Sequence, residues 1–206
     1  MARQRSTAPR LLLVEGKDDE HVVKHLYTEA VGPIDFEIER MGGVDQVGEE
    51  IDAHTKVPDR TALAVVVDAN SDMGSRWQSI RGGLARAGID TPPELPLGGA
   101  LIEQTRGGQP TVGVWLMPDN ENGGEIEDFV AGLISGDDVV WPLACDYIDR
   151  IPDEERPRKL SKARVHAWLA ARAEGAPMGG AIGQGKFDLE CDAAHRFSVW
   201  LRGVFS

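Results

Sequence analysis

Apolar residues follow two kinds of spacing along this chain, and each kind predicts a different element. Residues 11–14, 62–67 and 112–117 are short, continuous apolar runs. Such runs are typical of strands buried on both faces of a parallel sheet. Residues 34–38 alternate between apolar and acidic side chains and predict a half-buried strand, and residues 100–104 are expected to pair beside 112–117.

Between these runs, apolar residues recur at the spacing of an amphipathic helix. The clearest stripe consists of Ile126, Phe129, Val130, Leu133 and Ile134. Further helices are expected after Gly16 and over residues 44–53, 75–87, 139–151, 161–173 and 189–204. Strands that alternate with helices predict an α/β fold, in which a mostly parallel sheet carries helices on both faces. The last third then forms a helical C-terminal extension.

The chain has 206 residues, which corresponds to a single compact domain. Within it we expect residues 1–9 to form a flexible tail, residues 10–135 an α/β core, and residues 136–206 a helical part packed on the core. The first apolar run is much shorter than a membrane span of about 20 residues or a secretory signal core of about 7–15. We therefore expect a cytoplasmic protein without membrane association, and an oligomer is compatible with the sequence.

The charge balance narrows the classes of function. The chain has 22 Lys and Arg against 34 Asp and Glu, which gives a formal net charge of −12. This balance excludes a protein that wraps duplex nucleic acid through a broad basic face. It does not exclude a small site where carboxylates hold a cation that meets a phosphate.

Acidic residues follow the predicted buried strands. Glu15, Asp68 and Asp119 each come just after one of them, and Glu127 and Asp128 lie a little further on. Because sites of parallel α/β sheets form outside the carboxyl ends of the strands, these acids are expected to converge. Any one of them fits a helix cap or a turn equally well. Their recurrence favours a site for Mg²⁺ or Mn²⁺.

Two segments resemble the motifs of Toprim domains. Residues 14–19 read VEGKDD and resemble the first motif, a hydrophobic strand that ends in Glu-Gly. Residues 65–72 read VVVDANSD and resemble the second, a strand that ends in an Asp-x-Asp pattern. The resemblance covers residues 11–133 and implies a Toprim-like, Rossmann-like sheet. The segments 114–120 and 127–129 are similar to those of a small stand-alone Toprim-related family of largely unassigned function, with motifs like those of OLD nucleases.

The resemblance implies a role for each matched residue. Glu15 matches a general acid/base or metal ligand, and Asp68 matches a metal-binding aspartate. Asn70 departs from the motif, which has a second aspartate there. An amide oxygen can complete a Mg²⁺ shell without adding charge, so this departure puts metal affinity and catalysis in doubt. Asp72 matches the third acid of the motif.

The remaining candidates lie further along the chain. Glu127 and Asp128 resemble the acidic pair that OLD-type enzymes contribute to a second metal ion. Lys186, which follows Gly185, is the candidate donor to a phosphate in the transition state. Tyr27 and Tyr147 lie among apolar residues and are expected to pack, which argues against a tyrosine nucleophile of the topoisomerase kind. Asp19 and its neighbours are expected to interact with the dipole of the following helix.

Three functions fit these residues. The first is Mg²⁺- or Mn²⁺-dependent phosphodiester cleavage of DNA or RNA by a nuclease-like Toprim protein, through a small metal-centred contact. The second is a catalytically weak Toprim-like binding module that acts with a separately encoded partner such as an ATPase; Asn70 and the net charge of −12 favour it. The third is a small-molecule phosphohydrolase.

Overall fold

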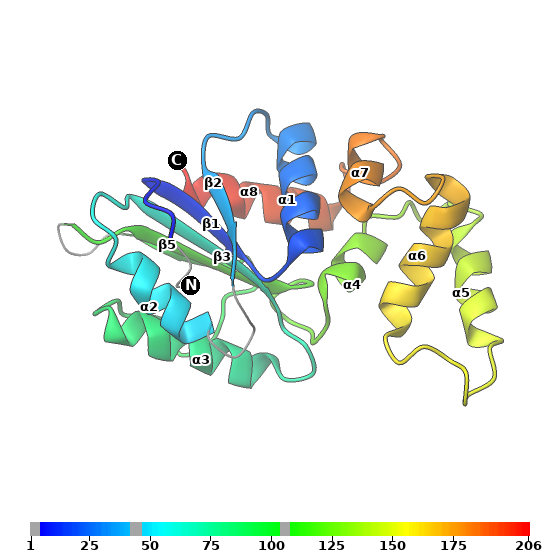
Figure 1. The fold of residues 1–206 in the computed structure, drawn as a ribbon, viewed down its shortest axis with the longest axis horizontal. Coiled ribbons are helices and arrows are strands. Elements are labelled where there is room, and N and C mark those ends of the chain that lie inside the picture. Colours follow the sequence, from blue (N-terminus) through cyan, green and yellow to red (C-terminus); the bar gives the residue numbers. More distant parts are fainter. Residues whose placement is uncertain (1–4, 42–46, 104–107) are drawn as a thin grey trace.

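The computed structural model describes residues 5–41, 47–103 and 108–206. Within these residues a five-stranded sheet has the order β2-β1-β3-β5-β4 (Figure 1). Its strands are β1 Arg10–Val14, β2 Glu37–Arg40, β3 Ala62–Asp68, β4 Ala100–Ile102 and β5 Thr111–Met117. The β2, β1, β3 and β5 strands are parallel to one another, and β4 pairs antiparallel with β5.

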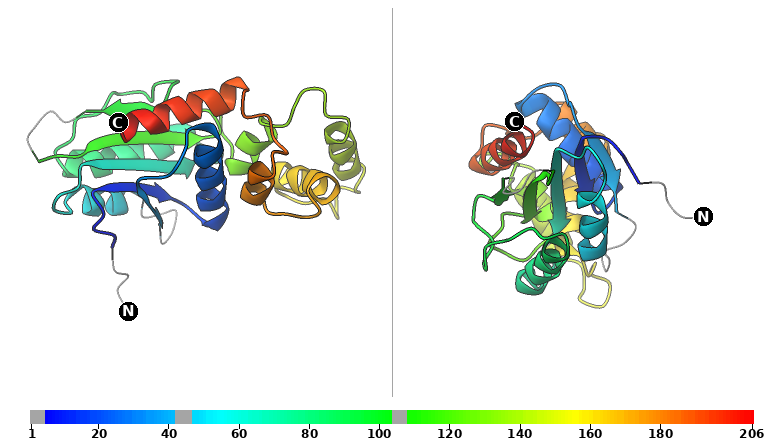
Figure 2. Two further views of the ribbon diagram at one scale, coloured as in Figure 1. Left: turned by 90° about the horizontal axis from the view of Figure 1, so that it is seen from above. Right: turned by 90° about the vertical axis from the view of Figure 1, so that its left-hand side faces the viewer.

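Helices cover both faces of the sheet, which confirms the predicted α/β class. They are α1 Lys17–Ala30, α2 Val47–Thr55, α3 Met73–Arg86, α4 Ile126–Ala131, α5 Trp141–Asp149, α6 Leu160–Arg172, α7 Met178–Gly183 and α8 Asp192–Val204. The α2 and α3 helices lie on one face, and α1 and α8 lie on the other (Figures 1 and 2).

The two covered faces explain why the strands are continuously apolar. Successive side chains of a strand point to opposite faces. In β1, Leu12 and Val14 pack on the α1 and α8 side, whereas Leu11 and Leu13 pack on the α2 and α3 side. Each of these four side chains is fully buried.

The C-terminal helix α8 is part of this core. Phe197 packs edge-on against Trp115 of β5, with 5.2 Å between the ring centroids. The indole nitrogen of Trp200 donates to the Ala100 carbonyl oxygen of β4 at 2.9 Å. The helical extension predicted after the α/β core therefore returns to the sheet and covers its antiparallel edge.

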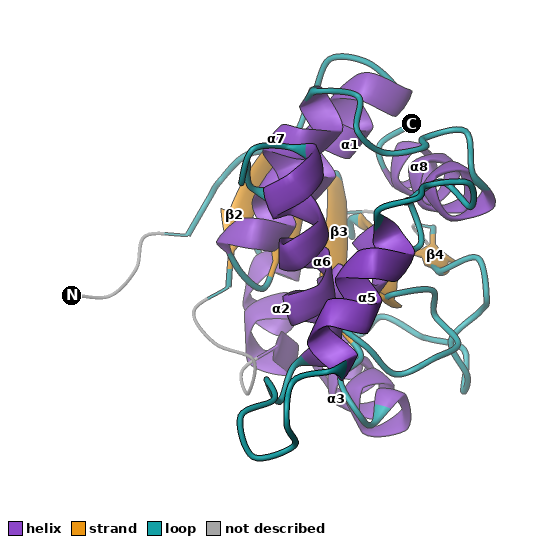
Figure 3. Ribbon diagram, turned by 90° about the vertical axis from the view of Figure 1, so that its right-hand side faces the viewer, coloured by secondary structure: helices purple, strands orange, loops and turns teal. Residues whose placement is uncertain are grey.

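The helices α4 to α7 lie beyond the carboxyl ends of the parallel strands (Figure 1). We call them the helical cap. Viewed from that end, α5 and α6 stand in front of the sheet (Figure 3). The α6 helix packs on α4 and α5, and α7 packs on α1. The division at residue 135 stays a prediction.

The predicted and observed elements differ at several places. The second strand begins at Glu37 rather than at residue 34. The sequence also predicts a loop over residues 175–185, where the structure has α7. Residues 44–46 of the predicted second helix and residue 104 of the predicted edge strand lie outside the described residues. Residues 1–4 of the predicted tail lie outside them too, whereas the Ser6 carbonyl oxygen accepts a hydrogen bond from Arg60.

Of the two tyrosines, Tyr27 is buried as predicted, but the prediction that Tyr147 packs is wrong. Its side chain is 63% exposed. The buried residues of α5 are instead Ala144 and Ile148, and Ile148 directly follows Tyr147 in the sequence. None of the described helices has both the length and the apolar character needed to cross a membrane.

Candidate functional site

The topology singles out the carboxyl ends of β1 and β3. These two strands are neighbours, but β1 leads through α1 to β2 on one side, and β3 leads through α3 towards β4 and β5 on the other. Ligand sites of open α/β sheets form at such a switch point. Glu15 and Asp68 lie there in contact: the Asp68 backbone N–H donates to Glu15 Oε1 at 3.1 Å.

Glu15 is held from two sides. Its Oε1 accepts the Asp68 N–H and lies 3.7 Å from Nη2 of Arg76, a residue of α3. Both side chains are only 12% exposed. Burial raises the pKa of Glu15, the positive charge of Arg76 opposes this shift, and the carboxylate of Asp19 adds to it.

Asp68 connects the strand ends to the cap. Its Oδ1 accepts the backbone N–H of Ile126 at 2.8 Å, so it caps the first turn of α4 from a distant part of the chain. Burial, together with the carboxylates of Asp19, Glu15 and Glu127, raises the pKa of Asp68 to about 8. The carboxyl group of Asp68 is therefore mostly protonated at pH 7 unless a cation neutralises the charge at this place.

Asp19 belongs to this site, although the sequence analysis assigns it only to the helix dipole. Its Oδ2 accepts the Gly16 backbone N–H at 3.1 Å, whereas its Oδ1 is buried with no hydrogen-bond partner. Burial is the main cause that raises the pKa of Asp19, and Glu127 contributes. A signal was available in the sequence: Asp19 continues the buried stripe of Val22, Val23 and Leu26 at helical spacing.

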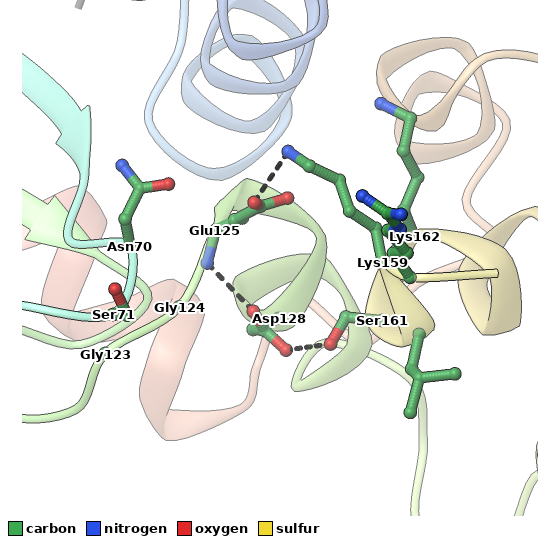
Figure 4. Close-up of a pocket in the computed structure, with 11 residues that line it drawn as sticks. Asn70, Ser71, Gly123, Gly124, Glu125, Asp128, Lys159, Ser161 and Lys162 are labelled. Atoms are coloured by element: carbon green, nitrogen blue, oxygen red, sulfur yellow. Dashed lines mark hydrogen bonds and ion pairs between the residues drawn. The ribbon is translucent and has the colours of Figure 1, made fainter.

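The acids of α4 contact the start of α6. Glu127 is buried, and Lys162 Nζ donates to its Oε1 at 2.7 Å. Asp128 Oδ2 accepts the Glu125 backbone N–H at 2.8 Å, and its Oδ1 accepts a hydrogen bond from Ser161 (Figure 4).

Two lysines of this region are absent from the sequence-based candidates. Lys162 also lies 3.7 Å from Asp18 Oδ2, and Lys159 Nζ lies 2.7 Å from Glu125 Oε1. Hydrogen bonds to Glu125 and Glu127 raise the pKa of Lys159 and Lys162, respectively. Nothing in their sequence spacing relates them to the distant acids, because only tertiary packing brings α6 to α4.

The other predicted ligands have local contacts. Asn70 has a left-handed backbone (φ 54°) and pairs with Gly124 through two backbone hydrogen bonds of 2.8 Å. Asp72 caps α3 by accepting the Ser75 N–H at 2.9 Å. Asp119 accepts the backbone N–H of Asn122 at 2.8 Å within its own turn.

Lys186 is not brought to the acids. It is exposed and lines a separate cavity of about 360 Å³ with Asp138, Trp168 and Arg172. Its catalytic role stays a prediction, and the lysines that contact the acidic site are Lys159 and Lys162.

An open cleft of about 530 Å³, which we call the cap cleft, lies next to these acids and is lined by Glu125 and Asp128 but not by Glu15, Asp19, Asp68 or Glu127 (Figure 4). One wall is formed by Asn70 and Ser71 with residues 123–125 and Asp128. The other wall is formed by residues 158–162. Gly123 permits the close approach of the first wall's two loops, because a Cβ there would lie 2.5 Å from the Asn70 carbonyl oxygen.

The donor chemistry of the strand ends fits a hard divalent cation. In the part of the chain that the structure describes, no three His, Cys, Asp or Glu side chains already form a metal-binding group. The buried Oδ1 of Asp19 nevertheless has no hydrogen-bond partner, and the raised pKa of Asp68 shows that this carboxyl group ionises unfavourably when no cation is present. Carboxylate oxygens are the ligands that Mg²⁺ and Mn²⁺ prefer. A cation bound here would replace contacts to protein donors.

Comparisons with known proteins place this chain in a family. A search of curated proteins finds no match. Among solved structures, the C-terminal region of the OLD protein of Xanthomonas campestris pv. campestris is 15% identical, with a TM-score of 0.48 over 96% of this chain and 94% of that one. The profile of the family described as "Protein of unknown function (DUF3226)" matches residues 9–206. The chain therefore belongs to the DUF3226 family.

Proposed function

We propose that this protein is a Toprim-type enzyme that cleaves phosphodiester bonds of nucleic acid with the help of Mg²⁺ or Mn²⁺. One observation carries the proposal: Glu15, Asp19, Asp68 and Glu127 converge at the topological switch point, where burial and the neighbouring carboxylates raise the pKa of Asp68 to about 8. Four carboxylates this close stay ionised together only with positive counterparts; Arg76 and Lys162 pair with two of them, and a bound cation would serve the others. The Toprim-like motifs around Glu15 and Asp68 support the same assignment.

The residues divide into holders of the cation and a proton-transfer group. Asp19, Asp68 and Glu127 would hold the ion, with Asn70, Asp72, Asp119 and Asp128 around them. When bound, the ion supplies charge neutralisation at the phosphate and acidifies a bound water. Glu15 is oriented by the Asp68 N–H and by Arg76, and its raised pKa suits it to accept and return a proton.

The alternative of a catalytically weak module that acts with a partner protein has an observation in its favour. Val139, Leu143 and Tyr147 are 72%, 66% and 63% exposed and recur at four-residue spacing on the cap. Exposed apolar stripes of this kind mark contact surfaces. A partner and a metal site are compatible, and the two candidates differ only in whether the isolated chain cleaves nucleic acid.

A cleavage assay with matched variants tests the enzyme. We expect the wild type to cut single-stranded or nicked DNA or RNA with Mg²⁺ or Mn²⁺ and not with EDTA. Glu15→Gln should lower the rate at least about 100-fold, the usual effect of losing an acid–base group. Asp68→Asn should lower it at least as much, because it removes a carboxylate that holds the cation. Glu29→Gln, on an exposed part of α1, is the control and should cut normally. Undiminished cleavage by both site variants would contradict the proposal.

A further inference from the structure

The charges of the cap are distributed unlike those of the whole chain. Residues 156–172 contain no Asp or Glu, although the chain has a net charge of −12. They contain six basic residues: Arg156, Arg158, Lys159, Lys162, Arg164 and Arg172. Residues 119–128 show the opposite composition, with five acids and no Lys or Arg. Parts of these two segments, residues 123–125 with Asp128 and residues 158–162, line opposite walls of the cap cleft.

Two lysines of the basic segment each form an ion pair with a different glutamate of the acidic segment. Lys159 Nζ lies 2.7 Å from Glu125, and Lys162 Nζ lies 2.7 Å from Glu127. Arg158 is exposed and makes no ion pair or hydrogen bond with any residue that the structure describes. We call Arg158, Lys159 and Lys162 the basic edge.

The lysines of the basic edge can exchange one anionic partner for another. The side chain of Lys159 is 64% exposed, and that of Lys162 is 42% exposed. A cation held by Glu127 would leave the ammonium group of Lys162 without its partner, and the exposed Lys159 can exchange Glu125 for another anion. Phosphate oxygens are equivalent acceptors for such groups.

We infer that the basic edge binds the phosphate backbone of a single nucleic-acid strand, next to the acids at the strand ends. This inference deepens the proposed function and rests on it, because it names the form of the substrate at the same site. The strand is DNA or RNA, since both carry the same phosphate chain.

The size and surroundings of the basic edge select a single strand. Residues 158–162 lie around the start of α6 at Leu160 and would span at most about 18 Å even if fully extended, enough for contact with a few phosphates. Directly before them, Asp153, Glu154 and Glu155 are exposed and add negative charge beside the edge. A second strand would bring its own phosphates towards these carboxylates.

The test measures binding rather than cleavage. Fluorescence anisotropy follows a labelled oligothymidylate on the full chain in Ca²⁺, over a series of salt concentrations, while gels verify that the strand stays intact. Arg158→Ala and Lys159→Ala remove the exposed members of the basic edge without uncovering the buried Glu127. Lys56→Ala is the control. Lys56 also makes a 2.6 Å ion pair, but its partner is Asp52 of α2, and neither residue lines the cap cleft.

We expect the wild type to bind the strand tightly, with an affinity that falls as salt is added. In a plot of log affinity against log salt concentration, each edge variant should have a slope that is less steep by about 0.7, the value for one lost phosphate contact on a single strand. Binding should be tighter in Ca²⁺ than in EDTA, and a duplex of equal length should bind more weakly. Binding of an oligouridylate instead supports the inference equally and identifies the strand as RNA. Unchanged slopes in both edge variants, equal loss in Lys56→Ala, or tighter duplex binding would overturn it.

Calorimetric titration of Mg²⁺ separates this inference from the proposed function. If Mg²⁺ binds and the chain cleaves, but the salt slopes of the edge variants are unchanged, the inference alone fails. If the slopes change as expected but neither Mg²⁺ binding nor cleavage is found, the proposed function fails and the basic edge remains a strand-binding surface.

Discussion

At the scale of single residues, Asp68 and Asp19 are two neighbouring buried carboxyl groups whose ionisation is unfavourable. Asp68 ends a fully buried strand, and Asp19 lies on the buried side of α1. Among the described residues neither carboxylate forms an ion pair, although Asp68 interacts with the charge of Lys159, and burial raises the pKa of both. Such strain persists in proteins mainly where a site needs it.

Replacing Asp68 by asparagine should stabilise the metal-free protein. Asparagine keeps an oxygen that can accept the Ile126 N–H, and it removes a carboxyl group that must take up a proton on folding because burial and the nearby carboxylates oppose its ionisation. We expect a gain on the order of 2 kcal/mol at pH 7, or about 4–8 °C in Tm, measured by thermal unfolding in EDTA. A lower Tm than that of the wild type would show that the charge of Asp68 is already compensated.

His54 predicts the response of stability to acid. It is fully buried, and burial, opposed by Glu39 and aided by Arg60, lowers its pKa below the ordinary value of 6.5. The unfolded chain therefore binds a proton at His54 as the pH falls through 6.5, whereas the folded chain does not. This contribution to stability is complete above that pH and is lost below it.

Urea unfolding of the wild type and of His54→Gln at pH 7.5 and 5.5 measures the effect. The wild type should lose on the order of 1 kcal/mol more than the variant between these pH values, since one pKa unit corresponds to about 1.4 kcal/mol. Equal losses in both proteins would show that His54 does not titrate differently on folding.

At the scale of elements, the buried strands and the long amphipathic helices could be predicted from the sequence. The spacing of their apolar residues is regular, because the same face of each element contacts the core along its whole length. The helix α7 could not be predicted. Its sequence, MGGAIG, has weak helix propensity. It is stabilised by packing: Met178, Ala181 and Ile182 are buried in the core that contains α1.

Close packing of α7 on α1 gives a prediction for two adjacent glycines. A Cβ at Gly179 would lie 2.4 Å from the His21 carbonyl oxygen, whereas one at Gly180 would meet nothing nearer than 3.6 Å. Gly179→Ala should therefore destabilise the protein by about 1–3 kcal/mol. Gly180→Ala is the control and should stabilise it by up to about 1 kcal/mol, because alanine favours the helix.

Chemical unfolding of both variants provides the measurement. Equal stability of the two would mean that α7 can move away from α1 without cost, and that the interface is looser than the structure shows.

At the scale of the whole molecule, the site joins three distant parts of the chain: the end of β1 with α1, the end of β3, and the α4 and α6 helices of the cap. A cation that binds all of them binds only the folded chain. It must therefore raise the stability of the whole protein by mass action.

Thermal unfolding at increasing Mg²⁺ or Mn²⁺ tests this coupling. The Tm of the wild type should rise with the logarithm of the ion concentration, with about 2.7 kcal/mol gained at one hundred times Kd. Asp68→Asn should show little or no rise, so that its advantage in EDTA disappears at high Mg²⁺. A parallel rise in both proteins, or an equal effect of Na⁺ at matched ionic strength, would assign the effect to general screening of the net charge.

The sequence by itself determined the α/β class, the buried strands and the placement of Glu15 and Asp68 at strand ends, because these follow from periodicities within short segments. Only the tertiary structure decided that Asp19 joins them, that Lys159 and Lys162 face the acids, and that Lys186 does not. The reason is physical: a local pattern records whether a residue faces core or solvent, but contacts between α4 and α6 depend on how distant helices pack. The sequence already contains an acidic segment at 119–128 and a basic segment at 156–172, but only the fold places parts of the two on opposite walls of one cleft.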